Sequence, residues 1–78
     1  MSGKYKLYFE GVSSYLEYPQ DIQRADLFGF LDSLVTRYHQ KTGSILIVKG
    51  VDERRSRVLM KFGRVNRPDV LQKIFNSL

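Results

Sequence analysis

Two stretches of this chain carry apolar residues at helical spacing, and each follows a region with the character of β-strands. The first helical stretch lies between Pro19 and Gly43, and the second follows Asn66. In so short a chain the apolar side of each helix must be buried against a sheet, which limits the fold to two layers. The predicted fold is therefore α+β, in the order ββαββα, with a three- to four-stranded sheet and both helices packed on one face.

The first two predicted strands lie before Pro19. Apolar and polar positions alternate in residues 4–10, and this period of two is typical of a half-buried strand. Residues 15–18 are also rich in strand-forming side chains, and Gly11 is suited to the turn of a hairpin that joins the two strands. If residues 15–18 do not form a strand, the order becomes βαββα.

The first helix is predicted between Pro19 and Gly43. Its apolar side chains recur three, four and seven residues apart, at Leu27, Leu31, Leu34 and Tyr38. Asp21 or Asp26 is the candidate N-cap, and Gly43 is suited to the left-handed residue that ends a helix. Gly29 lies in the middle of the helix, and we expect it to allow a close approach of the helix to the sheet.

The second half of the chain repeats the order of two strands and a helix. Residues 44–49 contain the run Ile45-Leu46-Ile47-Val48, which predicts a central strand with both faces covered. Residues 57–65 alternate in the manner of another half-buried strand. Asn66 is the predicted N-cap of the last helix, whose first turn contains Pro68.

The chain has the size of one domain, residues 1–78. Its halves resemble each other weakly, because the segment from Leu7 to Val12 parallels the segment from Leu46 to Val51. One interpretation is a ββα duplication of residues 4–42 and 45–78, and the alternative is coincidence. A core of this size gives little stability on its own, so we also expect a partner surface and predict a homo-oligomer, a dimer.

Several classes of function are excluded by what the sequence lacks. It has no Cys and one His, which excludes disulfide scaffolds, thiolate metal sites and any site with two imidazoles. It contains no phosphate-cradling glycine motif. Its longest apolar run has four residues, too few to cross a membrane, and its first residues lack the apolar stretch of a secretory signal. We therefore predict a cytoplasmic protein that is not an enzyme and uses no metal and no cofactor.

The positive charge of the chain is unevenly distributed. The formal net charge is +5. Five basic and five acidic residues lie in positions 1–48, whereas eight basic and three acidic residues lie from Lys49 onward. The entire excess therefore belongs to the second part of the chain, which indicates a local basic surface.

Three arginines of this basic region lie between the third and fourth predicted strands. The sequence Arg54-Arg55-Ser56-Arg57 places guanidinium groups on a hairpin tip, where they are suited to bidentate contacts with phosphates. The candidate nucleic-acid-binding residues, each expected to contact phosphate, are Arg54, Arg55, Arg57, Lys61, Arg64 and Arg67. Asp52 and Glu53 in the same loop argue against this interpretation, because they are able to neutralise the arginines.

The sheet face that the helices leave uncovered is the second candidate surface. The alternation places Lys6, Tyr8, Leu59 and Lys61 on it. Tyrosines there are able to stack on unpaired bases, and an exposed apolar sheet face commonly binds a partner. The first hypothesis is a non-enzymatic module that binds nucleic acid or a nucleoprotein assembly. The alternative is a protein–protein interaction module, an adaptor or inhibitor of a larger host or viral partner, that acts through this face or as a homodimer.

Overall fold

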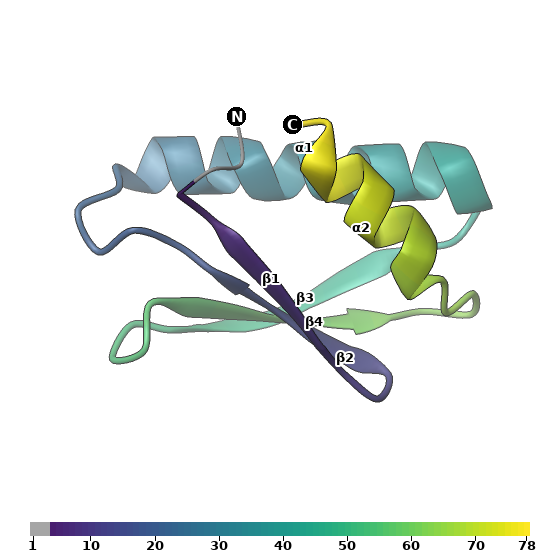
Figure 1. Ribbon diagram of the computed structural model, residues 1–78, viewed down its shortest axis with the longest axis horizontal. Helices are drawn as coiled ribbons and strands as arrows, with labels where there is room; N and C mark the ends of the chain where they lie inside the picture. The colour runs from purple at the N-terminus through teal and green to yellow at the C-terminus, as the bar shows by residue number, and fades with distance from the viewer. Residues whose placement is uncertain (1–3) are drawn as a thin grey trace.

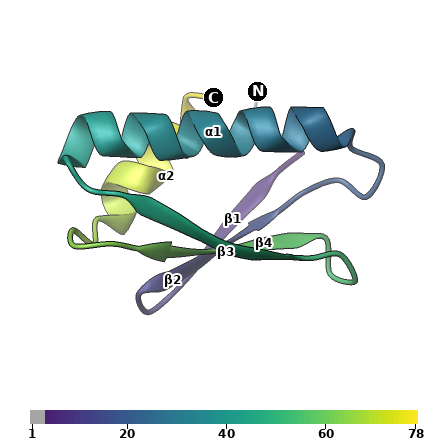
Figure 2. The same ribbon diagram turned by 180° about the vertical axis from the view of Figure 1, so that it is seen from behind.

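The computed structural model describes residues 4–78, which form a four-stranded sheet and a layer of two helices (Figure 1). The elements in chain order are β1 (Lys6–Glu10), β2 (Ser13–Glu17), α1 (Arg24–Thr42), β3 (Leu46–Asp52), β4 (Arg57–Phe62) and α2 (Pro68–Asn76). Both helices lie on the same side of the sheet, as the view from behind also shows (Figure 2). The predicted α+β fold and the ββαββα order are confirmed, and the presence of β2 removes the βαββα alternative.

The sheet is antiparallel throughout, with the strand order β1-β2-β4-β3. β1 and β2 form a hairpin, and its two-residue turn follows the pair formed by Glu10 and Ser13. Gly11 in this turn has a φ of 62°, a left-handed conformation that glycine adopts without strain. β4 lies between β2 and β3, so the two central strands come from different halves of the chain.

β3 lies at an edge of the sheet, and the prediction that residues 44–49 form a central strand with both faces covered is wrong. Leu46 is buried, whereas Ile47 and Val48 are 36% and 42% exposed. The cause is the strand order, because β4 pairs with β3 on one side and with β2 on the other. A run of β-branched residues reports a preference for extended backbone, but its burial depends on neighbours that the run itself does not specify.

α1 begins without the side-chain cap that the sequence predicts. Its N-cap is Gln23, whose side chain makes no capping hydrogen bond. Asp21 precedes the cap position and Asp26 follows it, in the first turn, where a negative charge still suits the helix dipole. Gly43 ends the helix as predicted, with a φ of 73°, and its N–H donates to the His39 carbonyl oxygen at 2.8 Å.

α2 begins at Pro68, and its N-cap is Arg67, so the prediction of Asn66 at that position is wrong by one residue. Pro68 fits the first turn because an N–H at that position has no partner within the helix. Asp69 in the same turn holds the Arg67 guanidinium through two hydrogen bonds of 3.0 and 2.8 Å. The start of α2 is therefore fixed by a proline and an ion pair, without a side-chain cap.

The core lies between the helix layer and one face of the sheet. Side chains that alternate inward along the strands meet the apolar stripes of both helices. The buried apolar side chains are Leu16, Leu27, Leu31, Leu34, Tyr38, Leu46, Val58, Met60, Phe62, Leu71, Ile74 and Phe75. Burial of this apolar area is the main driving force for folding, and it leaves the second face of the sheet free for another use.

Gly29 does not have its predicted role. It is exposed on α1, and an added Cβ atom meets no heavy atom within 4 Å, so no close approach to the sheet requires glycine there. The close approach occurs instead at Gly63, directly after β4. A Cβ atom at this position lies 2.9 Å from Ile45 Cγ1 and 3.0 Å from the Ile45 carbonyl oxygen. Glycine is therefore required where the chain leaves β4 and passes the start of β3.

Candidate functional site on the open sheet face

The face of the sheet opposite the helices is called the open face here, and its side chains alternate with the buried ones along each strand. They belong to Lys6, Tyr8, Glu10, Ser13, Tyr15, Glu17, Ile47, Asp52, Arg57, Leu59 and Lys61. Residues that pair directly across antiparallel strands point to the same face, which groups these side chains into rows. The prediction that Lys6, Tyr8, Leu59 and Lys61 share this face is confirmed.

Tyr8, Tyr15 and Leu59 form a continuous row across three strands. Tyr8 pairs with Tyr15, and Tyr15 pairs with Leu59. Neighbouring strands lie about 4.8 Å apart, so the two rings and the leucine form an apolar strip. Tyr8 is 43% exposed. Aromatic surface is therefore accessible in the middle of the open face.

The Arg57 guanidinium lies against both rings of this row. Its Cζ atom is 5.8 Å from the ring centroid of Tyr8 and 5.8 Å from that of Tyr15, distances that fit cation–π contacts. Its Nε atom lies 3.8 Å from the Glu17 Oε2 atom. That Nε is buried and has no hydrogen-bond partner among residues 4–78. The positive charge of Arg57 is thus held at the aromatic row by two rings and one carboxylate.

Charges alternate in sign along the row that contains Arg57. Lys6 pairs with Glu17, Glu17 pairs with Arg57, and Arg57 pairs with Asp52. Opposite charges in such cross-strand positions stabilise a sheet. The two positive and two negative formal charges of this row cancel, whereas Lys61, in another row, has no acidic residue directly opposite it.

The Tyr15 ring is held in place by Glu10. The Tyr15 hydroxyl donates a hydrogen bond to Glu10 Oε1 at 3.1 Å. This hydrogen bond and the negative charge of Glu10 raise the pKa of Tyr15 above its ordinary value. The hydrogen bond thus directs the Tyr15 hydroxyl at Glu10 and favours the protonated phenol.

The turn between β3 and β4 carries Arg54 and Arg55, as predicted, whereas Arg57, which was predicted on the same hairpin tip, is the first residue of β4. Asp52 Oδ1 accepts hydrogen bonds from the backbone N–H groups of Arg54 and Arg55 at 3.1 and 3.3 Å, which fixes the turn. The Arg55 guanidinium also lies 3.8 Å from the Asp52 carboxylate. Glu53 points elsewhere and pairs with Arg24 at 3.4 Å. Within residues 4–78 no carboxylate lies within 4.0 Å of the Arg54 guanidinium, so this tip stays positive.

The six residues predicted to contact phosphate do not gather in one patch. Those at the turn end of β4 are Arg54, Arg55 and Arg57, and those toward or beyond its other end are Lys61, Arg64 and Arg67. The length of β4 puts about 20 Å between its two ends. Arg67 is bound to Asp69 at the start of α2, within the helix layer. The compact site therefore consists of the open face and the adjoining β3–β4 turn, and it excludes Arg64 and Arg67.

Sequence reasoning does not single out Tyr15 as a member of the aromatic row. It lies between Ser14 and Leu16, both buried, in a strand of five residues that begins with two serines. The period-two signal is present there but short, and serines weaken it. Its position opposite Tyr8 and beside Arg57 depends on strand register, which a single segment does not contain.

No protein-family model, curated protein or solved structure matches this chain. Within residues 4–78, no three His, Asp or Glu side chains are grouped so that they could hold a metal ion. Neither α1 nor α2 has the length and apolar character that a helix needs to cross a membrane. The class of this protein is therefore given by its fold, which is a small α+β domain with one sheet face that the helices leave uncovered.

Proposed function

We propose that this protein is a non-enzymatic module that binds single-stranded nucleic acid, free or within a nucleoprotein assembly, on its open face. The cluster of Tyr8, Arg57 and Tyr15 is the observation that carries this proposal. Unpaired bases stack on accessible aromatic rings, and arginine adds cation–π contacts to a stacked base and charge to the backbone contact. A duplex keeps its base faces stacked inside the helix, so an exposed aromatic row favours a single strand.

Positive side chains flank the aromatic cluster along β4. Arg54 and Arg55 lie at the turn end of the strand, and Lys61 points from its other half on the same face. A single strand that follows β4 thus meets cations before and after the tyrosines. Each phosphate contact contributes about 0.7 to the salt dependence of binding to a single strand. Three such contacts predict that log Kd rises with log salt with a slope of about 2.

Binding of fluorescein-labelled, mixed-sequence single-stranded DNA and RNA, measured by fluorescence anisotropy at low salt, tests the proposal. Tyr8→Ala is expected to weaken binding by about fivefold to one hundredfold, the range that follows from base–aromatic stacking energies. Combined Arg54→Gln and Arg55→Gln substitutions are expected to lower the salt slope by about 1.4. Arg64→Gln is the matched control, because Arg64 is exposed and lies beyond the open face, and it is expected to leave the affinity within about twofold.

Two results would overturn the proposal. One is an absence of binding to both DNA and RNA at low salt. The other is a Tyr8→Ala variant that binds like the wild type while Arg64→Gln binds weakly, since charge outside the open face would then determine the affinity. Thermal unfolding of each variant distinguishes a binding defect from a folding defect.

A second candidate function, self-association into a dimer, is favoured by the exposed edge of β3. Val48 and Val51 on this strand are 42% and 45% exposed, and Phe28 of α1 is 50% exposed. Phe28 and Val51 line one cavity, so the apolar surface continues from the strand onto the helix. An uncovered strand edge is able to pair with the edge of another chain. Light scattering without oligonucleotide tests this candidate, with a dimer expected for the wild type and a monomer for Val48→Lys.

A further inference from the structure

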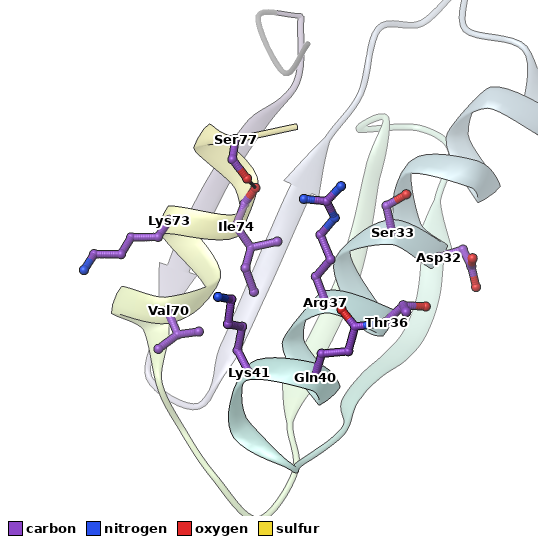
Figure 3. Close-up of a pocket in the computed structure, with 10 residues that line it drawn as sticks. All are labelled: Asp32, Ser33, Thr36, Arg37, Gln40, Lys41, Val70, Lys73, Ile74 and Ser77. Atoms are coloured by element: carbon purple, nitrogen blue, oxygen red, sulfur yellow. Dashed lines mark hydrogen bonds between the residues drawn. The ribbon is translucent and has the colours of Figure 1, made fainter.

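A groove of about 750 Å³ lies between α1 and α2, within the helix layer and away from the open face. Figure 3 shows Arg37 and Lys41 extending from α1 into the space between the helices, with Val70 and Ile74 facing them from α2. Lys73 lies at the outer rim and points away from the groove (Figure 3). The groove thus has a cationic side formed by α1 and an apolar side formed by α2.

The charge of this groove is not neutralised within the described chain. Asp32 is the one acidic residue that lines the groove, and no carboxylate of residues 4–78 lies within 4.0 Å of Arg37, Lys41 or Lys73. Four other arginines of the described chain, Arg24, Arg55, Arg57 and Arg67, do have a carboxylate within 4.0 Å, whereas Arg54 and Arg64 resemble Arg37 in having none. The groove is therefore a site of uncompensated positive charge.

Stabilisation by the helix dipoles accounts for the positions of two of these three cations. Lys41 and Lys73 lie in the last turns of their helices, where a cation is stabilised. Arg37 lies before the last turn of α1, and it is four residues from Lys41, a spacing at which like charges repel by a few tenths of a kcal/mol. The fold therefore carries a repulsive pair whose cost an external anionic group would remove.

The shape and the lining together select the kind of anion. Residues four apart on a helix are about 6 Å apart along its axis, so Arg37 and Lys41 match carboxylates one turn apart on a helix laid beside α1. Half-buried Val70, on the α2 side of the groove, suits the apolar side of such a helix, and Ile74 beside it is 5% exposed. A polyphosphate has no apolar part to place against the α2 side of the groove, whereas an amphipathic helix has one.

We propose that the groove between α1 and α2 binds an acidic amphipathic helix of a partner protein. The mode is that of a helix in a groove, with apolar contacts centred on Val70 and carboxylates paired with Arg37 and Lys41. The inference does not depend on nucleic-acid binding, because no residue of the groove belongs to the open face. The module then has two binding surfaces on opposite sides of the sheet.

A synthetic fluorescein-labelled peptide tests this proposal. The probe is an amphipathic helix with glutamates one turn apart and leucines beside them, and its matched partner carries glutamine in place of every glutamate. The glutamate peptide is expected to bind with a Kd in the micromolar range, at least about tenfold more tightly than the glutamine peptide. Arg37→Glu combined with Lys41→Glu is expected to weaken it at least about tenfold.

Two single substitutions on α1, one inside the groove and one outside it, test the specificity of peptide binding. Arg37→Gln is expected to weaken peptide binding about twofold to fivefold, whereas Arg24→Gln, outside the groove, leaves it unchanged. Arg37→Gln also removes a like-charge repulsion, so its melting temperature is expected to equal or exceed that of the wild type. Loss of binding in a variant of undiminished stability excludes unfolding as its cause.

The inference is overturned if the peptides bind equally, if neither binds, or if Arg24→Gln weakens binding as much as Arg37→Gln does. It is also overturned if labelled single-stranded DNA displaces the peptide and loses affinity in Arg37→Glu, because nucleic acid is then the ligand of the groove. Failure here leaves the open-face proposal standing. That proposal depends on the response of oligonucleotide binding to Tyr8→Ala, which the groove does not influence.

Discussion

The Tyr38 hydroxyl accepts a hydrogen bond from the Arg67 backbone N–H at 3.0 Å. The same hydroxyl donates to the Val65 carbonyl oxygen at 2.6 Å, and Tyr38 is fully buried. A side chain of α1 therefore satisfies two backbone groups of the segment that leads into α2. The Tyr38 hydroxyl thus holds the N-cap residue of α2 through its own N–H, although the Arg67 side chain makes no capping hydrogen bond.

Tyr38→Phe is expected to lower the free energy of unfolding by about 1–3 kcal/mol, because it removes two part-buried hydrogen bonds to backbone groups. Urea denaturation measures the change. Tyr18→Phe is the matched control, since Tyr18 is half-buried and its hydroxyl makes no hydrogen bond within residues 4–78. Equal midpoints for the wild type and Tyr38→Phe would show that the hydroxyl contributes nothing to stability.

Ser14 presents the opposite case, a buried polar group that costs stability. It is fully buried, pairs with Phe9 and Met60 on the neighbouring strands, and its hydroxyl has no hydrogen-bond partner among residues 4–78. Ser14→Ala is therefore expected to raise the free energy of unfolding by about 1 kcal/mol. Ser13→Ala, on the open face, is the control and is expected to change it by less than about 0.5 kcal/mol. A destabilised Ser14→Ala protein would contradict the expectation.

Two glycines are expected to respond to alanine with opposite signs. Gly63→Ala places a Cβ atom against the Ile45 side chain and carbonyl oxygen, so we expect a loss of about 1–3 kcal/mol. Gly29→Ala meets open space in the interior of α1 and gains helix propensity, so we expect a gain of about 1 kcal/mol. Thermal and urea unfolding of both variants provide the comparison. A stabilising Gly63→Ala would mean that the passage beside Ile45 is wider than the structure shows.

The element types of this fold were predictable from sequence because they rest on local periodicity. The spacing of Leu27, Leu31 and Leu34 is visible within one segment, and so is the left-handed stop at Gly43. The strand order was not predictable, because pairs such as Leu16 with Val58 join segments that are far apart in the chain. The exposure of β3 follows from this strand order, and the composition of the strand does not determine it.

The candidate site, too, was predictable only in the features that depend on local sequence. The charges of Arg54 and Arg55 on a turn were predictable, because a polar stretch between two strands identifies the turn. The contact of Arg57 with Tyr8 and Tyr15 was not, because it needs three strands in register. Arg67 was included in a phosphate-binding stripe from its place in the sequence, and in the structure its guanidinium is bound to Asp69 at the start of α2.

The Asp69 carboxylate provides a test of the local electrostatics at the start of α2. Its two hydrogen bonds from Arg67 lower its pKa to about 2, with help from the backbone N–H of Val70. The pKa in the folded state thus lies below the ordinary value of 3.8. By linkage, the stabilising contribution is present above the ordinary value and is lost as the pH falls through about 2.

An NMR titration of the Asp69 side-chain carboxyl carbon is expected to show a midpoint at about 2. Arg67→Gln removes both hydrogen bonds and the positive charge, so it is expected to raise this midpoint toward the ordinary value. Arg64→Gln removes an exposed charge that is not bonded to Asp69 and is expected to leave the midpoint unchanged. If the wild type titrates near 4, or if Arg67→Gln does not shift the midpoint, the ion pair does not form in solution and the entry to α2 relies on Pro68 and Tyr38 alone.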